Sequence, residues 1–426
     1  MNRQRRLLLQ ALAATGLLGR LPQAQATCAC SEAGRVVIIG GGFAGATCAK
    51  YLRYLNPQIE VILIEPKRDY YTCPFSNLVL AGMRTLPSLR QRYTALSKNY
   101  GIQVIHARVT AIEADVRLLQ VNNEAWLPYD RLVVAPGISM LWNAPAGYDE
   151  TAAEYMPHAW AAGPQTRLLR DQLQAMPDNG VVAISVPPRP FRCPPGPYER
   201  ACLIGHYLKQ HKPRAKLLML DANETFSKQD VFEEAWSVLY PDMIERVGVS
   251  GYGGVTRVDA RSNTLFTETD RYKVDVANVI PSQQAGQIAV QSGLADDSGW
   301  CPIDPSTFKS TLLPDIHVLG DACIADPIPK SATAANSQAK FAALVIAAEL
   351  AEETPPLPSL HNTCYSIAAP DYAFSVTGMY ALESGAIKAN ARAAAVSPLA
   401  AGNDLRKTEY RYAQGWYDSI IRDSFG

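Results

Sequence analysis

Short apolar runs rich in β-branched residues recur along the chain, and a turn with a helical pattern follows several of them. Residues 36–39 form the first such run and predict a strand. A helix-compatible segment follows, and a second apolar run at 59–64 predicts the next strand. Strand, helix and strand in this order indicate a βαβ unit of a parallel sheet.

The turn between the first strand and the helix carries the spacing G-x-G-x-x-G. Gly40 allows the tight turn, Gly42 lets a pyrophosphate approach the backbone, and Gly45 lets helix and strand pack closely. Twenty residues after Gly45 the second strand ends in Glu65, where a ribose-binding carboxylate belongs. The glycine spacing alone is a weak signal and also fits an ordinary tight turn. Strand, helix, strand and acid in register favour a dinucleotide site at the positive N-terminus of the helix.

The same alternation continues through the rest of the chain. Further strands are expected around residues 104–109, 118–121, 129–135, 180–186, 217–221 and 316–319, helices at 165–176 and 334–350, and a small antiparallel sheet within 246–275. We therefore expect an α/β fold with two Rossmann-like dinucleotide-binding-type domains and an α+β C-terminal domain. The expected bounds are 34–146 with 281–354 for the first domain, 147–280 for the second and 355–426 for the third.

The second Rossmann-like domain lacks a phosphate-binding fingerprint. After its first strand, where a second glycine turn for NAD(P)H would stand, residues 187–197 contain six prolines. Proline has no N–H group, so this segment cannot form the usual cradle for a pyrophosphate. We expect electrons to enter from a donor other than NAD(P)H.

The N-terminus predicts an export signal over residues 1–26. Arg5 and Arg6 precede an apolar run at 7–18, and Ala24-Gln25-Ala26 is typical of a cleavage site. The arginine pair favours the twin-arginine route, and a general secretory signal with a chance arginine pair is the alternative. The apolar run is too short to span a bilayer, and we expect a soluble periplasmic protein with no membrane span.

Composition narrows the possible functions further. The 426 residues carry no formal net charge, and removal of 1–26 leaves 36 basic and 40 acidic residues, so no nucleic-acid-binding footprint is visible. Nine cysteines are an odd number, so at least one has a role other than a disulfide within the chain. A C-x-x-C-H motif is missing, and the six histidines show no metal-ligand spacing. We therefore expect neither a haem on this chain nor a metal.

Several longer motifs resemble one family, the flavoprotein subunit of flavocytochrome c sulfide dehydrogenase, within the glutathione-reductase-like disulfide flavoproteins. They are Tyr-Tyr-Thr-Cys at 70–73, Phe-Arg-Cys-Pro-Pro-Gly-Pro-Tyr-Glu-Arg at 191–200, Gly-Asp-Ala at 320–322 and Asn-Thr-Cys-Tyr-Ser at 362–366. The resemblance extends over nearly the whole chain after residue 34. It departs at Cys323, where serine is expected, and at Ala332-Thr333, which replace a Gly-Tyr pair.

The resemblance implies an FAD enzyme that oxidises hydrogen sulfide to zero-valent sulfur or polysulfide. The electrons would pass from FAD to a c-type cytochrome subunit that carries the haem on a separate chain. A sulfide:quinone oxidoreductase is one alternative, although the C-terminal residues here are polar and lack an amphipathic membrane-binding pattern. An accessory flavoprotein of a thiosulfate-oxidising system, acting on the thiols of a partner protein, is another.

The resemblance also implies roles for particular cysteines. Cys73 matches the covalent anchor of the flavin through a thioether; eight residues of extended chain from Glu65 span up to about 26 Å, enough to follow an extended FAD. A buried free thiol is the alternative. Cys193 and Cys364 match a redox-active disulfide, for which a purely structural bridge is the alternative. Glu199 is a candidate catalytic base or simply a charge stabilised at a helix N-terminus.

Among the residues assigned to FAD, Lys330 alternatively is a solvated lysine, and Trp416 alternatively packs in the core of the last domain. The glycine fingerprint and the resemblance together assign to FAD Gly40, Gly42, Phe43, Ala44, Gly45, Glu65, Pro66, Lys67, Cys73, Asn77, Val109, Ala135, Pro136, Gly137, Gly320, Asp321, Lys330, Ser331 and Trp416.

Overall fold

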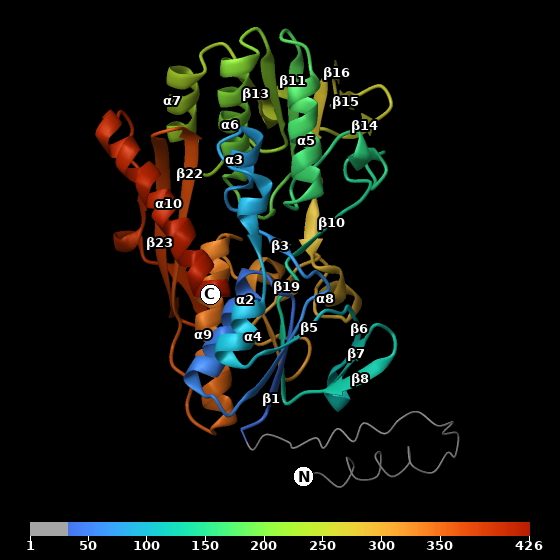
Figure 1. Cartoon of the computed structure of the whole chain (residues 1–426), viewed down its shortest axis with the longest axis vertical. Coiled ribbons are helices and arrows are strands. Elements are labelled where there is room, and N and C mark those ends of the chain that lie inside the picture. Colours follow the sequence, from blue (N-terminus) through green and yellow to red (C-terminus); the bar gives the residue numbers. More distant parts are fainter. Residues whose placement is uncertain (1–32) are drawn as a thin grey trace.

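The computed structural model describes residues 33–426, which form two domains and a C-terminal part (Figure 1). A first domain lies at one end and a second domain at the other, and the C-terminal part runs alongside both (Figure 1). The export signal expected at 1–26 lies outside the described residues.

A five-stranded parallel sheet forms the core of the first domain. Helices α2 (Phe43–Leu55) and α9 (Ala332–Leu350) pack against each other beside it. The central strand is buried at its last four residues, Val36 to Ile39, as expected for a parallel sheet that is covered on both faces. In order, the strands are β20 (Ile316–Val318), β9 (Arg131–Val134), β1 (Arg35–Ile39), β2 (Glu60–Ile64) and β5 (Gln103–Ile105). An antiparallel sheet of β6 (Val109–Glu113), β7 (Leu118–Val121) and β8 (Ala125–Pro128) is appended to it.

The second domain repeats the parallel arrangement with four strands. Helices α5 (Pro164–Ala175), α6 (Gly196–His211) and α7 (Gln229–Leu239) accompany its sheet. The strand order is β13 (Ile244–Val247), β12 (Lys216–Asp221), β11 (Val181–Val186) and β17 (Val276–Val279). The small antiparallel sheet expected within 246–275 consists of β14 (Arg257–Asp259), β15 (Thr264–Phe266) and β16 (Arg271–Lys273). Two Rossmann-like sheets with accompanying helices confirm the predicted α/β fold class.

The C-terminal part connects the two domains. Its long strand β22 (Ser359–Ala369) packs against α9 of the first domain and against α6 and α7 of the second. Strands β23 (Tyr372–Glu383), β24 (Ala386–Ala389) and β25 (Ala395–Val396) complete this sheet, and helix α10 (Asn403–Phe425) runs back to α2 (Figure 1). The Thr47 hydroxyl donates to the Ser424 hydroxyl at 2.9 Å where α2 and α10 meet. Residues on β22 therefore lie at the junction of all three parts.

None of the helices formed by residues 33–426 combines the length and the apolar character needed to cross a bilayer.

Candidate active site

A single cavity of about 1040 Å³ extends from the glycine turn of the first domain to the start of α6 and to β22. All three predicted catalytic residues, Cys193, Glu199 and Cys364, line it. The predicted cofactor residues that also line it are Gly40, Gly42, Phe43, Ala44, Glu65, Pro66, Lys67, Cys73, Asn77, Val109, Ala135, Pro136, Gly137, Gly320, Asp321, Ser331 and Trp416. The fold thus brings segments that are far apart in the sequence to one cavity.

The glycine turn of the first domain is shaped by two different constraints. A Cβ at Gly40, whose φ is +97°, would lie 2.3 Å from the Ala135 carbonyl oxygen, and a Cβ at Gly45 would lie 1.9 Å from that of Gly40. The protein's own packing therefore requires both glycines. A Cβ at Gly42 would meet nothing closer than the Tyr70 hydroxyl at 3.7 Å, so it would mainly occupy the cavity. The space kept open at Gly42 is what a pyrophosphate at the N-terminus of α2 needs.

Glu65 is fixed at the end of β2 by backbone donors. Its carboxylate accepts the N–H groups of Gly41 and Lys67, both at 2.9 Å. The carboxylate lines the cavity beside the glycine turn, where the sequence predicts a ribose contact.

The N-terminus of α9 faces another region of the same cavity, which Ser331, Ala332 and Thr333 line. The Ser331 hydroxyl caps the helix by accepting the Ala334 N–H at 3.1 Å, and it donates to the Asn362 side-chain oxygen at 2.5 Å. A helix of 19 residues directs the positive end of its dipole to this point, where an anion is stabilised.

Lys330, which the sequence assigns to FAD, does not line the large cavity, and its role toward the cofactor stays a prediction. Its ammonium donates to the carbonyl oxygens of Asp321 and Cys323, each at 2.8 Å, and lies 3.9 Å from the centroid of the Trp300 ring. These contacts turn it away from the large cavity, so it supports the Gly-Asp-Ala turn from behind. Burial raises the pKa of Asp321, which lines the cavity in front, and Arg192 and Lys330 oppose that shift.

Cys193 lies in the turn between β11 and α6, in the left-handed conformation with φ +58°. Its N–H donates to the Lys330 carbonyl at 2.8 Å, which joins this turn to the first domain. A Cβ at Gly196 would lie 3.0 Å from the Cys193 sulfur and 2.8 Å from the Trp160 ring, so this position must stay small. Burial raises the pKa of the Cys193 thiol, and nearby Cys364 and Glu199 raise it further.

Cys364 reaches the same cavity from β22, 171 residues further along the chain. Its thiol donates to the Asn362 side-chain oxygen at 3.4 Å. The structure holds Cys193 and Cys364 as free thiols, so it does not contain the predicted bond between them. A dithiol and a disulfide are two redox states of one pair, and the bond remains a prediction for the oxidised state.

Cys73, the predicted flavin anchor, follows strand β3 (Tyr70–Tyr71) in the loop that leaves Glu65. Its sulfur is half-buried, lines the cavity and lies 3.7 Å from the Trp160 carbonyl oxygen. The position is thus open to a ligand in the cavity.

Glu199 in the first turn of α6 ties three elements together. Its carboxylate accepts the Ile367 N–H on β22 at 2.9 Å and the Asn77 amide of α3 (Ser76–Leu80) at 2.8 Å. Burial raises the pKa of Glu199 despite these hydrogen bonds and the nearby positive charges of Lys228 and Arg200. Burial thus opposes the charged form of this carboxyl group, whereas its two N–H donors favour that form, and the catalytic role of Glu199 stays a prediction.

Asn77 and Trp416 have contacts that the sequence did not predict. The Asn77 amide donates to Glu199 and its oxygen accepts from Arg200 Nε at 3.0 Å, so Asn77 mainly positions the start of α6. The Trp416 indole N–H donates to the Thr333 hydroxyl at 3.2 Å. Trp416 therefore combines packing in the C-terminal part with a place in the cavity wall.

Sequence reasoning missed three positively charged residues of the site. Arg192 lines the cavity and donates to the Trp160 carbonyl oxygen. Arg200 is buried and donates only to uncharged acceptors, and burial lowers its pKa to about 10. Both stand inside the motif at 191–200, where two arginines among prolines and apolar residues were a signal. Lys228, which contacts β22, had no comparable signal.

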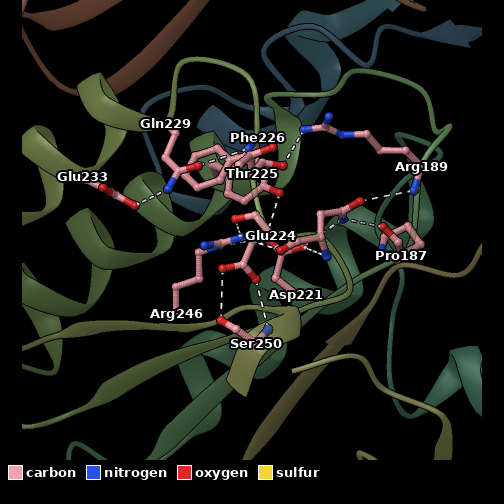
Figure 2. A network of polar contacts seen from close by, with 12 residues as sticks. Pro187, Arg189, Asp221, Glu224, Thr225, Phe226, Gln229, Glu233, Arg246 and Ser250 are labelled. Atoms are coloured by element: carbon pink, nitrogen blue, oxygen red, sulfur yellow. Dashed lines mark hydrogen bonds and ion pairs between the residues drawn. The ribbon is translucent and has the colours of Figure 1, made fainter. Parts of the chain in front are cut away.

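The acidic residue of the second domain that corresponds to Glu65 is Asp221, and neighbouring side chains already bind its carboxylate. Asp221 at the end of β12 is fully buried and accepts from Tyr198 Oη at 2.9 Å and from Arg246 Nε at 2.8 Å. Figure 2 shows Asp221 and Arg246 within a dense network that also holds Glu224 and Ser250. The Asp221 carboxylate is therefore not available to bind a ribose.

Comparisons with known proteins agree with this geometry. The family model "Sulfide dehydrogenase [flavocytochrome c] flavoprotein chain, central" matches residues 166–281, and "Flavocytochrome c sulphide dehydrogenase, flavin-binding" matches 356–425. "Pyridine nucleotide-disulphide oxidoreductase" matches 34–160. The flavoprotein chain of sulfide dehydrogenase [flavocytochrome c] from Chlorobaculum thiosulfatiphilum is 64% identical over 45 residues, 11% of this chain and 94% of that sequence.

The chain belongs to the flavocytochrome c sulfide dehydrogenase flavoprotein family.

Relatives of this family extend the match along the chain. Mitochondrial sulfide:quinone oxidoreductase of Mus musculus is 24% identical over 331 residues, 74% of this chain and 70% of that one. The solved structure of the sulfide:quinone oxidoreductase from Aquifex aeolicus superposes with a TM-score of 0.71 at 15% identity, over 91% of this chain and 92% of that one. The chain is a sulfide-oxidising flavoprotein oxidoreductase, and its family uses a flavin cofactor.

Proposed function

We propose that this chain oxidises sulfide at a Cys193–Cys364 disulfide next to FAD and delivers the electrons to a separate c-type cytochrome. One observation carries the proposal. The two cysteines, the half-buried Glu199 and the glycine cradle of the first domain line one cavity.

The residues present fit FAD along the length of the cavity. Gly42 leaves room for phosphates at the N-terminus of α2, Glu65 lies at the ribose position, and the N-terminus of α9 stabilises negative charge. Bound FAD supplies an acceptor of two electrons that can give them up singly, as a haem partner requires. We propose that a thioether to Cys73 holds it covalently, because Cys73 lines the same cavity.

Sulfide is a thiolate-like nucleophile, and the cysteine pair provides its target. HS⁻ donates its electron pair to one sulfur of the Cys193–Cys364 bond, that bond breaks, and the other sulfur leaves as a thiolate. One cysteine then carries a persulfide, with the proton on the added sulfur. Glu199 lines the cavity where H₂S would enter, and its carboxylate is the candidate acceptor of the proton of H₂S. A further HS⁻ takes the outer sulfur as polysulfide and leaves both cysteines as thiols. Bound FAD would accept the two electrons that are released when the thiols form the disulfide again.

We propose a periplasmic location and an export signal of the twin-arginine type at 1–26, supported by Arg5-Arg6 and the apolar run that follows. Quinone as the acceptor is the second candidate, because sulfide:quinone oxidoreductases are similar over about three quarters of this chain. The Chlorobaculum relative is the flavoprotein chain of a flavocytochrome c, which supports a cytochrome as the acceptor.

Anaerobic addition of sulfide to the purified flavoprotein tests the first half of the proposal, and we expect the flavin absorbance to bleach. Cytochrome c and a soluble ubiquinone analogue are then offered to the reduced protein in parallel. We expect reoxidation by the cytochrome to be at least about tenfold faster at equal concentration. Faster reoxidation by the quinone would assign the second candidate, and no bleaching would exclude free sulfide as the substrate.

A further inference from the structure

Lys228 is a buried lysine that the proposed reaction does not use. It precedes helix α7 in the left-handed conformation with φ +63°, and it is 7% exposed. Its ammonium donates to the Ser366 hydroxyl at 2.6 Å and to the Cys364 carbonyl at 3.2 Å. The second domain thus contributes a positive charge to the strand that carries one of the two reactive cysteines.

The ammonium of Lys228 lies on the thiol side of β22. Successive side chains of a strand point to opposite faces, so Cys364 and Ser366 share one face. Because Lys228 binds the Ser366 side chain, its charge lies on that same face. Cys364 and Ser366 both line the cavity, so the charge lies next to the cavity wall on the face of β22 that carries the thiol.

The surroundings of Lys228 leave its charge available to this thiol. Both of its hydrogen bonds go to uncharged acceptors, and the rings of Phe374 and Phe232 lie 5.4 and 5.8 Å from the ammonium. Burial lowers the pKa of Lys228, and the charge of Cys364 opposes that shift most strongly, followed by Glu199, Cys193 and Glu409. A cation in such an apolar setting interacts strongly with any anion that forms beside it.

We propose that Lys228 is a positioning residue whose ammonium is the counter-ion of a Cys364 thiolate once the Cys193–Cys364 bond has opened. The inference rests on the proposed function. When a thiol or HS⁻ opens the bond, the attacking sulfur gains a new S–S bond and the displaced cysteine keeps the electron pair of the old one. A cation beside Cys364 lowers the free energy of the opened pair and so makes the bond easier to reduce.

The test measures the equilibrium of the intact flavoprotein with glutathione. Two glutathione thiols convert the cysteine disulfide to the dithiol and form one glutathione disulfide, and the ratio is read by acid quenching, alkylation and mass spectrometry of the Cys193 and Cys364 peptides. Lys228→Gln keeps a hydrogen-bond donor but removes the charge. We expect its equilibrium to shift at least about tenfold toward the disulfide, which corresponds to about 30 mV for two electrons.

Two further variants separate charge from packing. Lys228→Arg keeps the charge and should stay close to the wild-type ratio. Lys209→Gln is the matched control, because Lys209 is an exposed lysine of the same domain that donates to the Leu239 carbonyl at 2.8 Å. It should leave the ratio unchanged.

A wild-type ratio in Lys228→Gln, in a protein that melts normally and retains its flavin, overturns the inference. If Lys228→Gln does not retain its flavin, Lys228→Met, which preserves the length and apolar stem of the side chain, decides by the same measurement. An oxidised wild-type protein without a Cys193–Cys364 peptide would instead overturn the proposed function, and this inference with it.

Discussion

The turn after β1 and the turn after β11 occupy the same place in two parallel sheets of one chain. The first is made of glycines and opens into a cavity of about 1040 Å³, with Glu65 held at its side by backbone N–H groups. The second is made largely of prolines, and its equivalent acid, Asp221, is fully buried under Tyr198 and Arg246. The same topology therefore supports a dinucleotide site in one domain and closes it in the other.

The difference teaches that the strand order alone does not determine a binding site. A phosphate cradle requires free N–H groups at a helix N-terminus, and prolines remove them. In the second domain the turn before α6 carries Cys193 and the start of α6 carries Glu199 and Arg200, and all three line the cavity that reaches the glycine turn of the first domain. The position that would hold a second nucleotide has become part of the candidate catalytic wall.

The largest expected effect comes from the cysteines at that wall. Cys193→Ser and Cys364→Ser should each lower sulfide-dependent cytochrome reduction by about 10³-fold or more, and the double variant should fall no further, since the two residues act as one unit. Flavin content should stay normal, because the cradle lies in the first domain. Near-normal turnover in Cys364→Ser would show that sulfide reacts without the pair.

Breaking the glycine turn of the first domain should remove the cofactor. Gly40→Ala places a Cβ 2.3 Å from the Ala135 carbonyl at φ +97°, and the backbone must move to accept it. We expect most of the flavin to be absent from the purified variant, measured as absorbance per protein. Gly415→Ala is the control, because nothing lies within 4 Å of its Cβ and its φ is ordinary. Full flavin in Gly40→Ala would contradict the assigned cradle.

The proposed thioether between Cys73 and FAD provides a further test of the cofactor site in the first domain. Cys73→Ser should bind FAD in the native state but release it to the supernatant on acid precipitation, whereas the wild-type precipitate should stay yellow. The native variant should keep most of its flavin, because Glu65 and the glycine turn still hold it. A colourless wild-type precipitate would show that Cys73 is only a thiol in the cavity wall.

Much of the difference between the turns after β1 and β11 could be predicted from the sequence, because it depends on local chemistry. Glycines at 40, 42 and 45, Glu65 and the proline run are local patterns with direct backbone consequences. The places of Cys193 and Cys364 came from the resemblance rather than from spacing. The contacts of the Lys330 ammonium with the carbonyl oxygens of Asp321 and Cys323 were not predicted, because the sequence cannot show where a long flexible side chain is directed.

The contacts between domains were beyond sequence reasoning. Lys228 binds β22, a strand 136 residues further along the chain, and Arg200 of α6 binds Asn77 of α3, 123 residues back. Such pairings depend on how two domains and a C-terminal strand pack, and no local pattern marks them. The closing of the second site was predicted from its prolines, but the filled carboxylate position was not.

The closed site of the second domain should contribute to stability. Asp221→Asn removes the charge opposite Arg246, whose side chain is 13% exposed, and leaves a buried guanidinium without its partner. We expect the free energy of unfolding to fall by about 3–5 kcal/mol, measured by denaturant unfolding. Asp178→Asn, at an ion pair whose arginine is 75% exposed, should cost less than about 1 kcal/mol. Equal losses would mean that the burial of Asp221 has no energetic consequence.

The smallest expected effect is that of NADH, which should not reduce the flavin. Prolines from 187 to 197 leave too few N–H groups for a pyrophosphate, and Tyr198 and Arg246 already occupy the carboxylate that would bind a ribose. Micromolar NADH under anaerobic conditions should therefore leave the flavin spectrum unchanged over minutes, while sulfide bleaches the same sample. Tyr198→Phe sharpens the comparison, because it releases one partner of the Asp221 carboxylate without restoring the glycine turn and should still give no response. Rapid bleaching of the wild-type flavin by NADH would mean that a nicotinamide reaches the cavity by a route other than the turn after β11, and the contrast between the two domains would then not explain the choice of electron donor.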